Sequence, residues 1–235
     1  MSEIADNLEK VRERIVLACR KSSRSSETVQ LIAVSKTVPS DRLRDAYEAG
    51  QVHFGESKLQ EAVGKIEELP SSICWHYIGR IQRNKVRKLL PLFDVLHAID
   101  SLKLASYVNE IAKELGLFPK VFLQINVGAE ESKGGFTFDE ARSEIEQILA
   151  LDRLEVLGLM CIPPETGVPE EARVWFAKLR RERDALEKCF QTSLPFLSMG
   201  MSGDYEVAIE EGATHVRVGS AIFGKRSYRV DGELG

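Results

Sequence analysis

Short apolar runs alternate with helical patterns along nearly the whole 235-residue chain, and this alternation limits the possible folds more than any other feature. The runs are rich in β-branched and aromatic residues, as buried strands are. Eight strands are expected, at 31–35, 51–54, 74–78, 95–99, 120–127, 154–161, 196–199 and 215–218. The helical patterns between them cover 41–49, 58–69, 84–90, 102–115, 139–150, 172–189 and 204–211.

Eight strands with intervening helices predict an α/β fold, a single (β/α)8 barrel of the TIM type. An open doubly wound sheet is the alternative, although it usually needs fewer units. Ile4, Leu8, Val11, Ile15 and Cys19 have helical spacing, so an extra helix over about 1–22 is expected before the barrel. Because no linker or repeat interrupts the pattern, we expect one domain over 1–235, with a short tail over about 225–235.

Composition and charge narrow the classes of function. The net charge of −4 disfavours nucleic acid as the main partner. No apolar run approaches the roughly 20 residues that span a bilayer, and the acidic N-terminus is not a secretory signal. The four cysteines and four histidines show no ligand spacing, so we expect reduced thiols, no metal, and packed or hydrogen-bonded histidines. A cytoplasmic protein that binds no membrane is therefore predicted.

Lys36 closes the first expected strand and carries the most chemical interest. It follows the apolar run 31–35, where the core gives way to the mouth of a barrel. A lysine amine in such a place can lose its proton by desolvation and attack a carbonyl to form a Schiff base. Taken alone, a surface lysine at a strand end is the commoner arrangement. The phosphate-binding pattern described next favours the Schiff base.

Small residues follow the seventh and eighth expected strands, where barrel enzymes favour a phosphate site. The loop at 198–204 contains Ser202 and Gly203 just before a helix, so their amides and the serine hydroxyl can contact an anion. After the eighth strand, Gly219 permits close backbone approach and Ser220 adds a hydroxyl. Glycine and serine also make ordinary turns. Two such loops at the two favoured positions nevertheless indicate a phosphate site.

A closed barrel places the eighth strand beside the first, so a ring attached to that phosphate would lean toward Lys36. Strand alternation puts Arg217 on the same face as Gly219, and we expect it to point inward beside Lys36. A nucleophilic lysine and a phosphate site together indicate pyridoxal 5′-phosphate. A Schiff-base aldolase acting on a sugar phosphate would use the same residues without a cofactor and stays an alternative.

Several motifs appear in a specific order, although each is weak alone. They are AVSKT at 33–37, FGE at 54–56, WHYIGRIQRNK at 75–85, LSMGMS at 197–202 and RVGSAIFG at 217–224. In this order, from about 31 to 223, the chain resembles the pyridoxal-phosphate homeostasis proteins. The resemblance implies a barrel like the N-terminal domain of alanine racemase.

The same resemblance implies roles for individual residues. It implies a Schiff base between the cofactor and Lys36, phosphate contacts from Ser202, Gly219 and Ser220, and a position for Arg217 facing the pyridine nitrogen. Three further cofactor contacts are expected at Asn84, Met199 and Gly203. The family usually has Asn after Phe-Gly-Glu, and this chain has Ser57 there.

The expected function is to hold, deliver or buffer the cofactor in vitamin B6 and amino-acid homeostasis, without established turnover. An arginine beside the ring nitrogen can only donate a hydrogen bond, which weakens the ring as an electron sink.

We also expect a monomer, since few residues follow Gly224, and transient contact with enzymes that require the cofactor. A small amino-acid racemase is the alternative. Lys133, in a glycine-rich loop, is a minority candidate for a second aldehyde acceptor.

Overall fold

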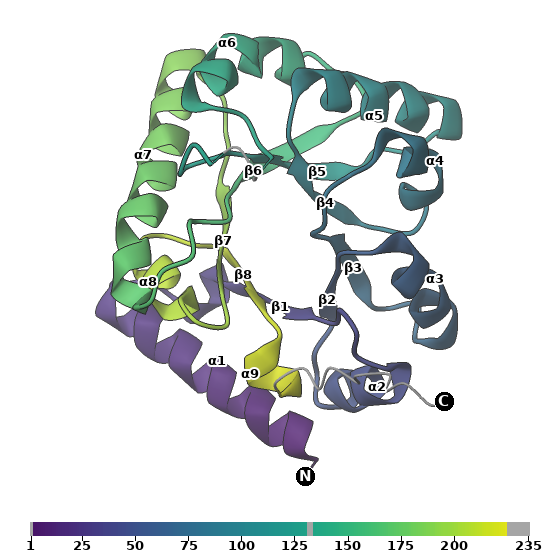
Figure 1. The fold of residues 1–235 in the computed structure, drawn as a ribbon, viewed down its shortest axis with the longest axis vertical. Helices are drawn as coiled ribbons and strands as arrows, with labels where there is room; N and C mark the ends of the chain where they lie inside the picture. Colours follow the sequence, from purple (N-terminus) through teal and green to yellow (C-terminus); the bar gives the residue numbers. More distant parts are fainter. Residues whose placement is uncertain (1, 131–133, 225–235) are drawn as a thin grey trace, which may run out of the picture.

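A computed structural model describes residues 2–130 and 134–224, and its strands form a closed parallel barrel in sequence order (Figure 1). This confirms the predicted TIM-type barrel. Lys133 and the expected tail from about 225 lie outside the described residues. The strands are β1 (Gln30–Val34), β2 (His53–Glu56), β3 (Cys74–Tyr77), β4 (Val95–Ile99), β5 (Lys120–Gln124), β6 (Glu155–Met160), β7 (Phe196–Met201) and β8 (His215–Val218).

Helices surround the barrel on its outside (Figure 1). They are α1 (Glu3–Lys21), α2 (Ser40–Glu48), α3 (Leu59–Glu68), α4 (Val86–Leu89), α5 (Leu102–Leu115), α6 (Phe138–Leu149), α7 (Arg173–Phe190), α8 (Tyr205–Glu210) and α9 (Ser220–Phe223). Short 3-10 turns cover Ser26–Thr28, Arg83–Lys85 and Pro169–Ala172. The expected helix at 84–90 is therefore a 3-10 turn followed by a single α-helical turn. Among the described residues, no helix combines the length and apolar character needed to cross a membrane.

The boundaries of the longer helices follow from local chemistry. Ser101 caps α5 by accepting the amide of Leu104, and Gly116 ends the helix with a left-handed φ of 67°. In α6, Thr137 and Glu140 bond each other's backbone amides in a capping box. Such signals are readable from sequence, which explains why the predicted and observed limits of α5 coincide.

β2 lies two residues later in the chain than predicted. The expected strand covered 51–54, but the pairing with β1 and β3 runs over His53–Glu56. Val52 is exposed, whereas Glu56 is completely buried. A carboxylate seldom ends a buried strand, because its burial is costly unless a partner compensates the charge. The partner is Lys65 of α3, described below, which the sequence pattern did not reveal.

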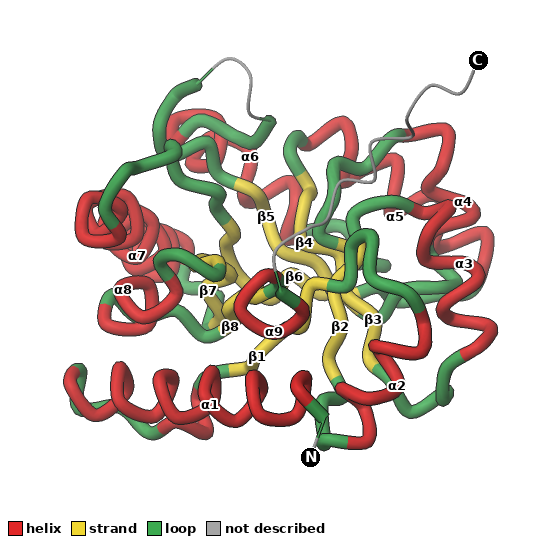
Figure 2. The backbone as a smooth tube through the Cα atoms, turned by 60° about the horizontal axis from the view of Figure 1, so that its bottom comes forward, coloured by secondary structure: helices red, strands yellow, loops and turns green. Residues whose placement is uncertain are grey.

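The first helix covers the seam where the barrel closes. β8 pairs with β1, and Gln30 lies opposite His215. The helix α9 that follows β8 is a single turn, and α1 runs alongside α8 and α9 across this seam (Figures 1 and 2). Its apolar face is buried, and the side chain of Asn7 donates to the carbonyl of Ile222 in α9. The predicted N-terminal helix therefore completes the outer layer.

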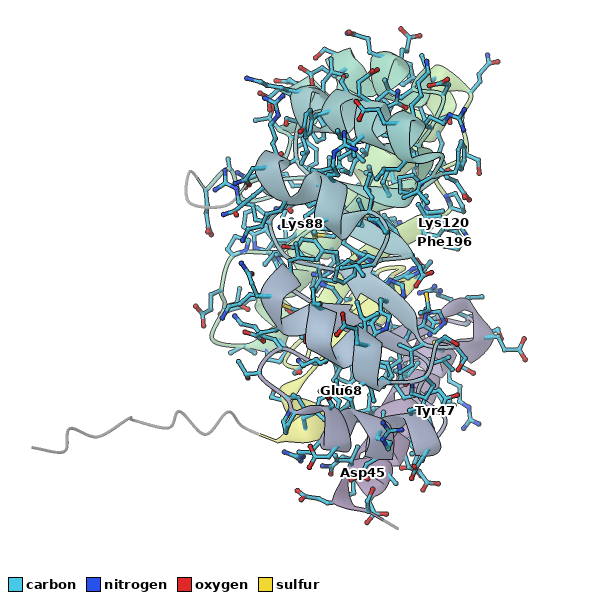
Figure 3. All side chains as sticks on the ribbon, turned by 90° about the vertical axis from the view of Figure 1, so that its right-hand side faces the viewer. Asp45, Tyr47, Glu68, Lys88, Lys120 and Phe196 are labelled. Atoms are coloured by element: carbon cyan, nitrogen blue, oxygen red, sulfur yellow. The ribbon has the colours of Figure 1, made fainter. Side chains whose placement is uncertain are left out.

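Two kinds of packing lie on the two sides of the sheet. Between strands and helices the core is apolar, with large buried side chains such as Phe54, Phe176 and Tyr205. The barrel interior is instead partly polar. It contains hydrogen-bonded side chains, and the bond between His97 of β4 and Ser198 of β7 joins strands that are not neighbours. Figure 3 shows Lys120 and Phe196, the first residues of β5 and β7, together at one edge of the molecule, which marks the N-terminal end of the barrel.

Candidate functional site

The three segments predicted to form the site do meet at the C-terminal end of the barrel. The amide of Gly219, after β8, donates to the hydroxyl of Ser202, after β7, over 3.0 Å. A Cβ on Gly219 would lie 3.3 Å from Val34, the last residue of β1. Ser202 is half-buried, while Gly203 and Ser220 are exposed. The hydroxyl of Ser202 accepts one bond and keeps its own proton to donate to an anion.

Lys36 lies in a turn just beyond β1 and is half-buried. The strand ends at Val34, so strand alternation does not by itself orient the lysine. The next residue, Thr37, has a left-handed φ of 63°, which is uncommon for a residue other than glycine. Its amide donates to Oε2 of Glu61 on α3 over 3.0 Å. The conformation of the turn is therefore held by its surroundings.

A buried ion pair supports the other side of this turn. Nζ of Lys65 on α3 donates to the carbonyl of Ser35 over 2.7 Å and pairs with Oε1 of Glu56. The hydroxyl of Ser35 donates to the same carboxylate over 2.8 Å. Sequence reasoning missed this cluster. The signal was present, because Leu59, Ala62 and Lys65 repeat every three residues and share the buried face of α3.

Arg217 lies inside the barrel, as expected, and is only 4% exposed. Its Nη1 donates to Oγ of Ser198 over 2.7 Å, and its Nη2 donates to the carbonyl of Cys161 over 2.9 Å. Burial lowers the pKa of the guanidinium from its ordinary value. Arginine nevertheless stays protonated. A guanidinium has five donors, so these two contacts fix its position and leave donors for a ligand.

Beneath Arg217, histidines continue the hydrogen bonds through the barrel. Nδ1 of His97 lies 2.8 Å from Oγ of Ser198, Nδ1 of His76 lies 2.9 Å from Nε2 of His97, and Nδ1 of His53 lies 3.0 Å from Nε2 of His76. We call these residues, together with Arg217, the interior polar chain. Burial holds the pKa values of His76 and His97 well below the usual range, so both rings are neutral. The expectation of hydrogen-bonded strand histidines agrees with this arrangement.

The remaining predicted contacts lie in different environments. Asn84 is exposed on the 3-10 turn after β3. Met199 lies within β7, and its side chain is fully buried in the apolar core, so only its main chain is left for a ligand.

Ser57 follows β2, and its hydroxyl is buried with no hydrogen-bond partner among the described residues. A Cβ on Gly79 would lie 2.2 Å from the carbonyl of Ser57, so these two loops are in close contact.

These residues fit a ligand with an aldehyde, a phosphate and a ring nitrogen. The amine of Lys36 matches the aldehyde, and the joined loops at Ser202 and Gly219 match the phosphate. Donors of Arg217 match the nitrogen, and the unpartnered hydroxyl of Ser57 is a further polar group at the same mouth. The geometry thus defines a small barrel whose C-terminal mouth brings together a half-buried lysine, two joined loops able to contact an anion, and a buried guanidinium.

Comparison with known proteins gives the same class. The family model for the N-terminal domain of alanine racemase matches residues 3–227. Proteins named pyridoxal phosphate homeostasis protein are 44% identical over 230 residues in Pseudomonas aeruginosa and 42% identical over 224 residues in Aquifex aeolicus. These alignments cover 97% and 95% of this chain, and 98% of each relative. The chain belongs to the pyridoxal phosphate homeostasis protein family.

Solved structures agree on the fold. PipY of Synechococcus elongatus, solved with pyridoxal phosphate bound, superposes with a TM-score of 0.83 at 40% identity. That comparison covers 94% of this chain and all of PipY. An alanine racemase from Clostridium difficile has a TM-score of 0.70 at 16% identity, and the comparison covers 57% of the racemase. At that identity the racemase shows only a shared barrel.

Proposed function

We propose that this protein binds pyridoxal 5′-phosphate at the C-terminal mouth of the barrel and serves vitamin B6 homeostasis. In this proposal Lys36 holds the aldehyde as a Schiff base. Ser202, Gly203, Gly219 and Ser220 hold the phosphate. The observation that carries the proposal is the hydrogen bond between Gly219 and Ser202, which joins the two anion-binding loops next to the end of β1.

Arg217 supports a role in holding the cofactor over a role in catalysis. The bound cofactor supplies an electron sink for carbanions, and the sink is strongest when its ring nitrogen is protonated. A buried guanidinium that always donates keeps that nitrogen unprotonated. The relatives are named homeostasis proteins, not enzymes, which fits this proposal. Transient contact with enzymes that require the cofactor, cytoplasmic location and a monomeric state are part of the same proposal and are predictions from the sequence.

Trapping of the bound cofactor tests the proposal directly. The purified protein is mixed with pyridoxal phosphate, reduced with borohydride, digested and analysed by mass spectrometry. We expect a reduced adduct on Lys36 and a visible absorption band that Lys36→Ala removes. Lys103→Ala on α5 is the matched control and should keep both. An adduct on another lysine in the unmodified protein would refute the role of Lys36.

Turnover assays separate the carrier from the racemase alternative. We expect no turnover at ordinary enzyme rates with a panel of amino acids as substrates. A steady racemisation rate that disappears in Lys36→Ala would replace the carrier proposal with an enzymatic one.

A further inference from the structure

We propose that His53, Cys74 and His76 form a second site, which binds a divalent transition metal of the zinc class at the N-terminal end of the barrel. The three residues showed no ligand spacing in the sequence, because His53 lies on a different strand from the other two. The fold brings them together. The site is at the opposite end of the strands from Lys36 and is separate from the proposed cofactor site.

Pairing of β2 with β3 creates the cluster. His53 and Cys74 are the first residues of their strands and lie directly opposite each other. His76 follows Cys74 by two residues, so both point to the same face of β3. That face is the barrel interior, because His76 bonds His97 of the interior polar chain. One ligand atom from each residue lies within 4.8 Å of the other two.

Two of the three distances between ligand atoms are within about 0.4 Å of those in a tetrahedral metal centre, and the third is under 4.8 Å. With metal–nitrogen bonds of about 2.05 Å and metal–sulfur bonds of about 2.3 Å, two nitrogen ligands lie about 3.4 Å apart and a nitrogen and a sulfur about 3.6 Å apart. Nε2 of His76 is 3.5 Å from Sγ of Cys74 and 3.0 Å from Nδ1 of His53. Small side-chain rotations of His53 and Cys74 would therefore complete the three ligand positions.

The surroundings meet a further requirement of a metal site. A ligating imidazole usually donates its other N–H to a fixed partner, and Nδ1 of His76 lies 2.9 Å from Nε2 of His97. A metal on Nε2 of His76 leaves the proton on Nδ1, where it completes this hydrogen bond.

Cys74 would change its protonation on binding. Burial, and then the carboxylate of Asp94, raises the pKa of its thiol to about 12, whereas Lys120 opposes the rise. On metal binding the S–H bond breaks, a sulfur–metal bond forms, and one proton leaves to solvent. Asp94 is not part of the three-residue group, and its Oδ2 accepts a hydrogen bond from the amide of Trp75 over 2.7 Å, so water would provide the fourth ligand.

One of the three ligands borders a cavity in the structure. His53 lines a cavity of about 310 Å³ formed by α1, the start of β1 and the segment before β2. Lys120 lies at the same end of the molecule (Figure 3). The site therefore has three ligands, a supporting hydrogen bond and a neighbouring cavity at His53.

Cobalt(II) titration tests the site in the full-length protein without added cofactor. Tetrahedral cobalt bound to a thiolate gives intense visible bands and a near-ultraviolet sulfur-to-cobalt band. We expect saturation at one cobalt per chain, release of one proton, and displacement of cobalt by zinc. Cys74→Ser should abolish the sulfur-to-cobalt band. His53→Gln should weaken cobalt affinity at least tenfold.

Two control variants distinguish cobalt binding at this site from binding at a surface thiol or at the cofactor site. Cys189→Ser, at an exposed cysteine of α7, should leave the bands intact. Lys36→Ala should leave them intact as well, because Lys36 lies at the other end of the barrel. Circular dichroism verifies that each variant is folded, and His53→Gln provides the test if Cys74→Ser does not fold. Failure to bind cobalt at micromolar concentration, or a sulfur-to-cobalt band that persists in Cys74→Ser, would overturn the proposal.

Discussion

The neutral histidines inside the barrel should make the fold sensitive to mild acid, and His215 allows the size of the effect to be worked out. His215 is the first residue of β8 and is half-buried, and burial lowers its pKa from 6.5 to about 4. Each pKa unit between the folded and unfolded chains is worth about 1.4 kcal/mol. Complete protonation of His215 therefore costs the folded state about 3 kcal/mol, and about 2 kcal/mol of this is lost by pH 5.

The sign follows from proton binding. Between pH 6.5 and 4 the unfolded chain binds a proton at this position and the folded chain does not, so acid favours unfolding. The full stability is present above about pH 6.5 and is lost as the pH falls toward 4. Urea unfolding followed by circular dichroism at pH 8, 6 and 5 gives the free energy of unfolding at each pH. His215→Gln keeps an amide that can bond Thr214 but removes the titration.

We expect the loss of stability from pH 8 to pH 5 to be about 2 kcal/mol smaller in His215→Gln than in the unmodified protein. Gln30→Ala is the matched control, because Gln30 pairs with His215 across the seam and does not titrate. Its effect should be the same at every pH. Parallel pH profiles for His215→Gln and the unmodified protein would refute the claim that His215 is held neutral by burial.

Two further substitutions test the supports of the cofactor site. Glu56→Gln leaves the ammonium of Lys65 buried without its counter-charge. The free energy of unfolding, measured in urea, should therefore fall by about 3–5 kcal/mol. A loss below about 1 kcal/mol would show that the pair is solvated. Ser202→Ala removes a hydroxyl from the proposed phosphate site, and loss of one hydrogen bond to a charged group should weaken pyridoxal phosphate about tenfold or more in an absorption titration. At saturating cofactor the Lys36 adduct should still form in Ser202→Ala, and unchanged affinity would remove Ser202 from the site.

The sequence predicted the barrel because its signals are local and repeated. Apolar runs mark each strand, and capping residues such as Ser101 and Gly116 mark helix ends. The meeting of Ser202 with Gly219 also followed, since barrel closure places β8 beside β1 and strands seven and eight end together. These inferences needed only periodicity and topology.

The contacts inside the barrel could not be predicted from the sequence. Glu56 and Lys65 resemble surface residues in the sequence, because charged side chains are usually exposed. Each is buried here because the other compensates its charge, and the two lie on different elements. The bond from His97 to Ser198 joins β4 to β7 across the barrel, and no spacing rule relates residues so far apart. Met199 looked like part of a ligand loop, yet strand alternation turns its side chain into the apolar core while Ser198 faces the interior.

The position of α1 over the closing seam has a consequence for synthesis on the ribosome. The helix and β1 emerge first, but their partners β8 and α9 are among the last described segments of the chain. Until those segments emerge, one edge of β1 and the part of α1 that contacts α8 and α9 have no native neighbours. Contacts between segments so distant in sequence form slowly, and unpaired edges promote aggregation. Nascent chains truncated before β8 should therefore depend on chaperones.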